Sequence, residues 1–483
     1  MLDSLWNPVV IWLFVVASWL PIAGPVQVLA YLAPAALAGI AVLTGAAEIS
    51  RRVFTWLLGL AAFALAASAF YEDTGVLHPM LGLLTYSSVV ILALRFRRSA
   101  GATGAPALRT FIVATAWLSL LQAALGVAQL VAEHGGLTFA SLDAGDSVVG
   151  TLRTNSHVYA VKMLFQGLVL AIAYGASRRD ASNRYPRSLL LAGAASAFVG
   201  ALLASALLTT AAFLGAIAAW ATWKLVRVGV TEVITHGGLL RSRWYVTRVL
   251  PAGLLASALL IGVALSTQAG NVRNVVLMAE RVLSGSVRIP KIETLRISAL
   301  EVLPADGKTL AVGLGLGRYS SRAAMILSGS YLRNHPEWIP RSSSEQTQRY
   351  IYPRWTRDMK VRAAGSILGM PTSSAQSVLV EFGLVGTALI IAFAVAIARE
   401  ARSKLERLRP AESTVEGAML KAVPLILWCL FAVSFTELWL EYAPLMAYVY
   451  LGLAVALSAG DAHGPRLPSP TVEAPGALAR TPL

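Results

Sequence analysis

Long apolar blocks alternate with short polar segments along the whole chain. Most blocks approach the roughly 20 residues that an α-helix needs to cross a bilayer. We therefore expect twelve membrane-spanning helices, at residues 6–21, 26–45, 53–71, 79–95, 110–131, 157–176, 188–204, 207–225, 244–266, 376–398, 421–437 and 442–459. The seventh and eighth come from one continuous apolar stretch, which must contain a tight turn near residue 205.

The charges of the polar segments support this division. Arg and Lys occur in EISRR, RFRRSAGATGAPALR, SRRDASNRYPR, residues 224–248 and REARSKLERLRP, but are absent from PIAGP, YEDTG, ALLTT and TELWLEY. Positively charged loops of membrane proteins stay on the cytoplasmic side. The alternation predicts that both termini are cytoplasmic. A single helix over residues 188–225 would invert every later segment.

Two of the predicted outer segments are longer than the others. Residues 133–157 contain Arg153 as their only Arg or Lys, and residues 267–375 contain 15 Lys and Arg against 7 Asp and Glu. A long domain can be translocated despite its positive charge. The chain therefore divides into helices one to nine in 1–266, a periplasmic domain in 267–375, helices ten to twelve in 376–460, and a Pro-rich, disordered cytoplasmic tail in 461–483.

The composition agrees with an all-α polytopic membrane protein. Of the 483 residues, 56% are hydrophobic and 13% are charged, which excludes a soluble globular protein of this size. Cys429 is the only cysteine and lies within an apolar block, so we expect no disulfide and no cysteine-based metal site. The chain contains no D-x-D pair, and we therefore predict no metal site.

The stretch AVGLGLGRYSSR, residues 311–322, places three glycines at alternate positions directly before Arg318. This G-x-G-x-G spacing departs from the G-x-G-x-x-G of dinucleotide-binding loops, and the predicted topology puts it outside the cytoplasm, where nucleotides are not available. Glycine lets backbone N–H groups approach an anion closely, and Arg binds phosphate oxygens in pairs. The stretch predicts an anion-binding loop. The alternative is a tight turn that needs glycine for backbone reasons alone.

Three stretches of the chain share a characteristic order: GTLRTNSHVYA at 150–160, SGSVRIPKIETLRISALEVLPADGKTLAVGLGLGRY at 284–319, and SSAQSVLVEFGLVGTALIIAF at 373–393. The second and third resemble the core of the O-antigen ligase and O-antigen polymerase superfamily, and the first is similar to an earlier helix entry of that family. The resemblance implies a GT-C-like architecture of about twelve helices in the bacterial inner membrane, with the large periplasmic loop between helices nine and ten. Two positions depart from the family: Thr372 or Ser373 stands where members often have His, and LLTT replaces a Ser-Arg-Gly turn.

The resemblance also implies an activity. Members of the family transfer a glycan from an undecaprenyl diphosphate carrier to an acceptor hydroxyl, with inversion and without a metal or cofactor. The expected partners are the lipid-linked glycan donor, a glycan or lipid acceptor, membrane lipids and other polysaccharide-assembly proteins, but no nucleic acid. We favour a polymerase of O-antigen or exopolysaccharide, because the ligase-associated His is missing. A ligase acting on lipid A-core is one alternative, and a transporter of lipid-linked glycans is another.

Such a transfer needs fixed cations, because the leaving diphosphate gains charge as the sugar–oxygen bond breaks. Lys162 is a separate signal, since an ionisable side chain within a predicted membrane span indicates function. The predicted diphosphate- or substrate-binding residues are Arg153, His157, Lys162, Arg288, Lys291, Arg296 and Arg318. Their alternative role is contact with ordinary anionic lipid headgroups.

The acceptor hydroxyl also needs a general base within hydrogen-bond reach. His335 is the only histidine in the predicted periplasmic domain and is the first candidate. Glu381, in the sequence VEFG at the outer end of span ten, is the carboxylate alternative. The competing roles are a surface histidine and a carboxylate that packs or caps a helix entry.

Overall fold

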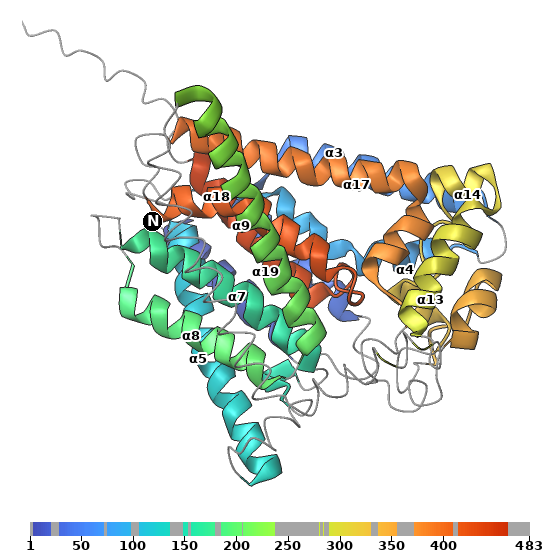
Figure 1. The fold of residues 1–483 in the computed structure, drawn as a ribbon, viewed down its shortest axis with the longest axis horizontal. Coiled ribbons are helices and arrows are strands. Elements are labelled where there is room, and N and C mark those ends of the chain that lie inside the picture. Colours follow the sequence, from blue (N-terminus) through green and yellow to red (C-terminus); the bar gives the residue numbers. More distant parts are fainter. Residues whose placement is uncertain are drawn as a thin grey trace, which may run out of the picture.

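The computed structural model describes most of the chain and shows a predominantly helical protein (Figure 1). The described residues are 3–20, 29–71, 75–97, 106–135, 148–152, 156–178, 185–204, 206–236, 289–329, 337–354, 371–408 and 414–461, with Glu280 and Ser284. The α-helices are α1 (Asp3–Ala17), α2 (Ala33–Leu43), α3 (Arg51–Ala69), α4 (Leu77–Thr85), α5 (Pro106–His134), α7 (Ser156–Ser177), α8 (Arg187–Leu203), α9 (Leu207–His236), α13 (Pro290–Ile297), α14 (Gly307–Val312), α15 (Arg322–Leu327), α17 (Ser374–Arg407), α18 (Val415–Val433) and α19 (Ala443–Asp461). Short 3-10 helices cover Leu29–Tyr31, Ser87–Ala93, Gly150–Leu152, Leu303–Ala305 and Tyr352–Arg354, and π-helical turns cover Ser298–Val302 and Thr347–Ile351.

The protein is a multi-pass membrane protein by the length and composition of its helices. In the described part of the chain, six helices are long and apolar enough to cross a bilayer, namely α3, α5, α7, α17, α18 and α19. Three more, α1, α2 and α8, are apolar but shorter. The predicted span 244–266 and the tail 461–483 lie outside the described residues, apart from Asp461 at the end of α19.

The apolar stretch around residue 205 contains two helices, as predicted. Helix α8 ends at Leu203, and α9 begins at Leu207. The predicted span 79–95 differs, because α4 ends at Thr85 and a 3-10 helix follows. The Ser88 hydroxyl donates to the Ala443 carbonyl at 3.2 Å. This packing against the start of α19 accompanies the change of helix type.

A small β-sheet interrupts the helical fold and was not predicted. Strands β1 (Ala47–Ile49) and β2 (Leu94–Phe96) pair antiparallel, with Glu48 opposite Arg95. Both strands belong to segments that the charge pattern places on the cytoplasmic side. The Arg95 guanidinium bonds to the Glu400 carboxylate at 2.8 Å, and the Lys404 ammonium lies 3.0 Å from the same carboxylate. Three predicted inner segments therefore meet at one end of the protein.

Glu400→Gln is expected to destabilise this end of the protein, because the substitution leaves two partly desolvated cations without their shared carboxylate. The side chains of Arg95, Glu400 and Lys404 are only 8%, 16% and 8% exposed. Breaking a buried ion pair costs about 3–5 kcal/mol. The midpoint of thermal unfolding in detergent measures the loss. Glu406→Gln is the control, since its carboxylate is 52% exposed in a surface pair. Equal midpoints for the two variants would contradict the prediction.

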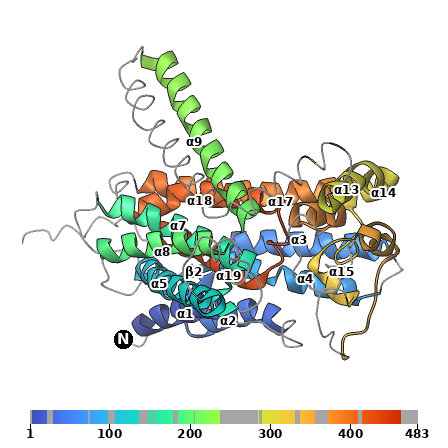
Figure 2. The same ribbon diagram turned by 60° about the horizontal axis from the view of Figure 1, so that its bottom comes forward.

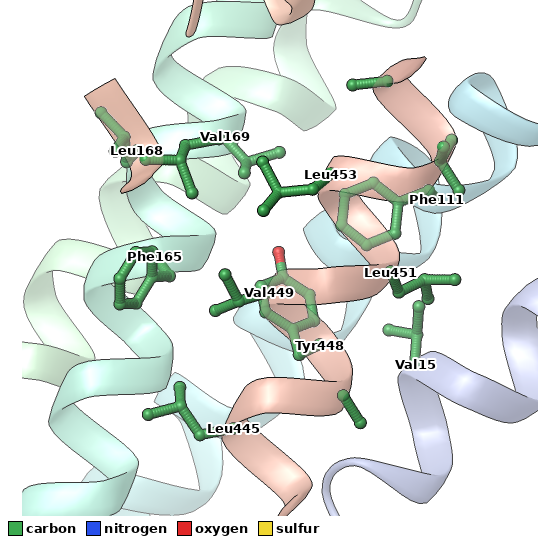
Figure 3. Close-up of a cluster of buried hydrophobic side chains, with 14 of the residues drawn as sticks. Val15, Phe111, Phe165, Leu168, Val169, Leu445, Tyr448, Val449, Leu451 and Leu453 are labelled. Atoms are coloured by element: carbon green, nitrogen blue, oxygen red, sulfur yellow. The ribbon is translucent and has the colours of Figure 1, made fainter. Parts of the chain in front are cut away.

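The centre of the bundle is built around α19. Figure 3 shows its side chains Tyr448 and Leu453 among those of α1, α5 and α7. The rings of Phe111 and Tyr448 lie 5.4 Å apart, and the Tyr448 hydroxyl is 3.2 Å from that of Thr115. In the apolar stretch of α19, 89% of the residues are buried, so this helix is surrounded by protein on nearly all sides.

The helices from residues 290 to 327 lie at the end of the bundle opposite to the chain's N-terminus (Figure 1). There α14 packs against α17, and α15 packs against α4. Short polar side chains begin three of these helices: Asp306, Ser321 and Ser373 accept backbone N–H bonds in the first turns of α14, α15 and α17. Such N-caps satisfy donors that helix geometry leaves without partners. The glycine-rich loop, residues 313–321, lies among these helices at this end of the bundle, and we call this region the junction.

Candidate functional site

The glycine-rich loop, residues 313–321, wraps around the carboxylate of Glu381. Gly317 donates its backbone N–H to Oε2 of Glu381 at 2.7 Å. Tyr319 and Ser321 donate theirs to Oε1 at 3.0 and 3.1 Å. The sequence predicted a loop whose amides face a phosphate, and in the structure three of these amides donate to a carboxylate of the same protein.

The loop is also paired with the backbone of α17. Leu314 donates its N–H to the carbonyl of Val380 at 2.9 Å, and Gly315 donates to that of Glu381 at 3.0 Å. These carbonyls are released from the helical ladder because α17 is interrupted at Gly383, which has φ 64° and ψ −170°. The interruption thus exposes backbone acceptors to which the loop attaches.

Each of the three loop glycines has a positive φ, between 74° and 83°. A Cβ on Gly313 would lie 2.5 Å from the backbone of Glu381, and one on Gly317 would lie 2.5 Å from the carbonyl oxygen of His78. Both conformation and space therefore require glycine. This explanation supports the alternative that the sequence left open, in which backbone requirements select the glycines.

Glu381 has a structural role in this arrangement. The residue is 1% exposed, and both carboxylate oxygens accept hydrogen bonds from the loop. A carboxylate that accepts several backbone N–H bonds holds its donors in place. The predicted use of Glu381 as a general base would require it to exchange these bonds for a bond to the acceptor hydroxyl.

Two cations gather over the ring of Tyr71, directly after the membrane helix α3. The guanidinium carbon of Arg318 lies 5.3 Å from the ring centroid, and Nζ of Lys308 lies 4.0 Å from it. Arg318 also donates to the Tyr71 carbonyl at 2.6 Å, and the Tyr71 hydroxyl donates to the Gly313 carbonyl at 2.9 Å. Arg318 is 3% exposed, whereas Lys308 is exposed. We call these three residues, Tyr71, Lys308 and Arg318, the Tyr71 cluster.

A second buried carboxylate, Glu441, holds Arg322, the residue that directly follows the same loop. The backbone N–H of Arg322 donates to Oε2 of Glu441, and the Tyr86 hydroxyl donates to Oε1 at 3.1 Å. Burial and the nearby charge of Glu381 raise the pKa of the Glu441 carboxyl to about 8. Two acidic side chains from separate elements therefore fix one loop between them.

The stability of the protein is expected to fall as the pH rises from about 4.5 to about 8, in part through Glu441. Its carboxyl has an ordinary pKa of 4.5 and a pKa of about 8 in the folded protein, so folding takes up a proton in this window. Glu441→Gln should flatten the pH dependence of the unfolding midpoint, because the amide does not titrate. An unchanged slope in the variant would show that Glu441 ionises normally in the folded state.

The remaining predicted cations either contact residues outside the Tyr71 cluster or lie outside the described residues. Lys291 donates to the carbonyls of Thr372 and Thr436 at 2.8 and 2.5 Å, and burial lowers its pKa to about 8. Arg296 is 68% exposed and lies 3.9 Å from Glu301. Arg153, Arg288 and His335 lie outside the described residues.

Lys162 is fully buried within the bundle. Its ammonium donates to the carbonyl and the hydroxyl of Ser18 and lies 4.1 Å from the centroid of a Trp19 ring. His157 is half-buried at the start of the same helix, α7. In this arrangement Lys162 connects α7 to the end of α1.

Sequence reasoning did not select several residues of the junction as site candidates, although His78 is one of the histidines in the predicted outer segments. His78 is buried, with Nδ1 2.5 Å from the Gly317 carbonyl oxygen and Nε2 3.0 Å from the Ser342 hydroxyl. Lys308 could have been selected from the sequence, because it stands within residues 284–319, the block that carries the family resemblance. Glu441 stands in TELWLEY, a predicted outer segment. The available signal was that this segment contains two acidic residues, Glu437 and Glu441, and no Arg or Lys.

Within the described ranges, no group of three or more His, Cys, Asp or Glu side chains is arranged to hold a metal ion. Comparison with protein families finds no matching family, and comparison with curated proteins finds no significant match. The family relationship therefore remains a prediction from the motifs of the chain.

Proposed function

We propose that the protein is a glycosyltransferase of the bacterial inner membrane that uses an undecaprenyl-diphosphate-linked glycan at the periplasmic face. The observation that carries the proposal is the Tyr71 cluster, in which two cations of the basic domain lie directly beyond the end of a membrane helix. A lipid-linked diphosphate has its charges at this level of the bilayer. The motif resemblance and the excess of cations in residues 267–375 support the same reading.

In the proposed reaction, the acceptor hydroxyl attacks the anomeric carbon while the bond to the diphosphate oxygen breaks. Lys308 is the cation at the surface and contacts the leaving diphosphate, and Arg318 adds positive charge behind it. Charges that are fixed before the reaction stabilise the developing negative charge without reorganisation. His335 remains the proposed general base, because the Glu381 carboxylate is occupied by the loop.

Three activities are distinguished by one experiment. The purified protein is placed in proteoliposomes that contain a polyprenyl-diphosphate oligosaccharide, and the products are separated by length. A ladder of glycan lengths supports the favoured polymerase, and a single transfer to added lipid A-core supports the ligase. Movement of the unchanged lipid across the bilayer, with no new glycosidic bond, would replace the proposal with the transporter.

Lys308→Ala and Arg318→Ala are each expected to lower turnover by roughly 10²-fold, the effect of removing one preorganised charge-stabilising group. Arg318→Lys should recover only part of the loss, because a point charge does not reproduce the planar fork of Arg. Initial rates on the lipid-linked donor measure the effect at equal amounts of folded protein.

The exposed residues Arg341 and Arg349 provide matched controls, since their alanine variants should retain nearly full turnover. Because Arg318 is buried, its variants are compared only after their unfolding midpoints are measured. The exposed Lys308 gives the sharper test. Equal rates for Lys308→Ala and the two controls would remove the Tyr71 cluster from the mechanism.

A further inference from the structure

Helix α9 carries a cluster of aromatic and basic side chains that the proposed reaction does not use. The rings of Trp220 and Trp223 lie 5.1 Å apart. Nζ of Lys224 lies 5.3 and 5.2 Å from their centroids, and the guanidinium carbon of Arg227 lies 5.6 Å from that of Trp223. Two cations are thus held against two adjacent indoles on one part of the helix.

This part of α9 faces away from the bundle. The indole of Trp428 on α18 donates to the Ala216 carbonyl at 3.1 Å and attaches the preceding turns. Beyond this contact α9 leans away from the other helices, as Figure 2 shows. Trp223 is 48% exposed, and Lys224 and Arg227 are exposed.

The charge pattern of the helix favours an anionic partner. Residues 207–231 carry Lys224 and Arg227 and no Asp or Glu, and the first acidic residue of the helix, Glu232, follows five positions after Arg227, so this part of the helix has a net positive charge. The cluster begins the basic segment that the alternation of charges places on the cytoplasmic side. Trp is enriched where a bilayer meets water, and basic side chains beside anionic headgroups gain attraction there.

We propose that Trp220, Trp223, Lys224 and Arg227 form a binding site for the headgroup of an anionic phospholipid in the cytoplasmic leaflet. The indoles lie at the boundary between acyl chains and headgroups, and the two cations contact the phosphate. The ring faces hold the cations near this boundary. The site does not depend on the glycosyltransferase activity, and its occupant is a lipid of the surrounding membrane.

The test uses the full chain in phosphatidylcholine vesicles that contain increasing amounts of phosphatidylglycerol with brominated acyl chains. Bromine quenches nearby indoles, and the double variant Trp220→Leu, Trp223→Leu isolates their contribution from that of the other tryptophans. Quenching should reach half its maximum at a lower mole fraction of brominated phosphatidylglycerol than of brominated phosphatidylcholine. The double variant Lys224→Gln, Arg227→Gln should weaken this preference by about 30-fold. Each cation contributes about 1 kcal/mol beside an anionic surface, and the two contributions together correspond to this factor.

Arg51→Gln with Arg52→Gln is the matched control, since these two exposed arginines begin the membrane helix α3 in a segment that the charge pattern also places on the cytoplasmic side. The control should keep the preference for phosphatidylglycerol. Equal quenching by both lipids in the unchanged protein would overturn the proposal, as would a preference that survives in Lys224→Gln, Arg227→Gln. Quenching of the two indoles by neither lipid would show that protein covers this face.

Discussion

Glu381→Gln is expected to unfold the junction between the glycine-rich loop and α17. The carboxylate accepts three backbone N–H bonds, and the glutamine amide group can replace only one of its two oxygens. The other position would present an N–H donor to an N–H donor in a buried site. The cost is on the order of 3 kcal/mol or more, because hydrogen bonds to charged groups are strong and buried donors without partners are expensive. The midpoint of thermal unfolding in detergent measures it.

The exposed Glu406→Gln serves again as the control, and its midpoint should stay close to that of the unchanged protein. The comparison also separates two roles for Glu381. A variant that keeps its midpoint but loses turnover on the lipid-linked donor would support the sequence-based prediction of a general base. Loss of both together is the outcome that the hydrogen bonds predict.

Gly383→Ala is expected to be at least as damaging. Gly383 has φ 64° and ψ −170°, a region that is essentially restricted to glycine. A Cβ there would lie 2.4 Å from the backbone nitrogen of Gly313, and backbone cannot move aside as a flexible side chain does. The strained conformation alone costs about 1–3 kcal/mol, and the overlap adds to it. Little folded protein should be recovered from membranes by size-exclusion chromatography.

Gly59→Ala is the matched control for this change. Gly59 lies within α3, and a Cβ on it meets nothing within 4 Å. In a helix interior the same substitution should stabilise by about 0.5–1 kcal/mol. A Gly383→Ala protein that is as abundant and as stable as Gly59→Ala would contradict the interruption of α17 at this residue.

The hydrophobic pattern predicted the helical class and many helix positions because bilayer thickness fixes the length of a spanning helix. The break between α8 and α9 followed from the charges of distant loops, which constrain topology whatever the local sequence prefers. The strands at Ala47–Ile49 and Leu94–Phe96 were not predictable in this way. Each is three residues long, too short for a periodic signal, and exists because the two segments meet.

The glycine-rich loop shows a different limit. Its amides were expected to face a phosphate, but a carboxylate and a phosphate both accept hydrogen bonds from backbone N–H groups. The choice between them depends on Glu381, which lies 64 residues beyond Gly317 in the chain. The partner of Lys162 was unpredictable for the same reason, since its contact with Ser18 spans 144 residues. Local motifs specify the chemistry of one partner and leave the other open.

The dependence of the loop on Glu381 also determines where the protein can be divided. A secreted fragment of residues 267–375 would keep the three amide donors and lose the carboxylate that they surround, because Glu381 belongs to the membrane helix α17. The part that looks like an independent outer module in the sequence is thus completed by a residue of the transmembrane region. The glycine-rich loop is expected to acquire its native conformation only together with the membrane helix α17.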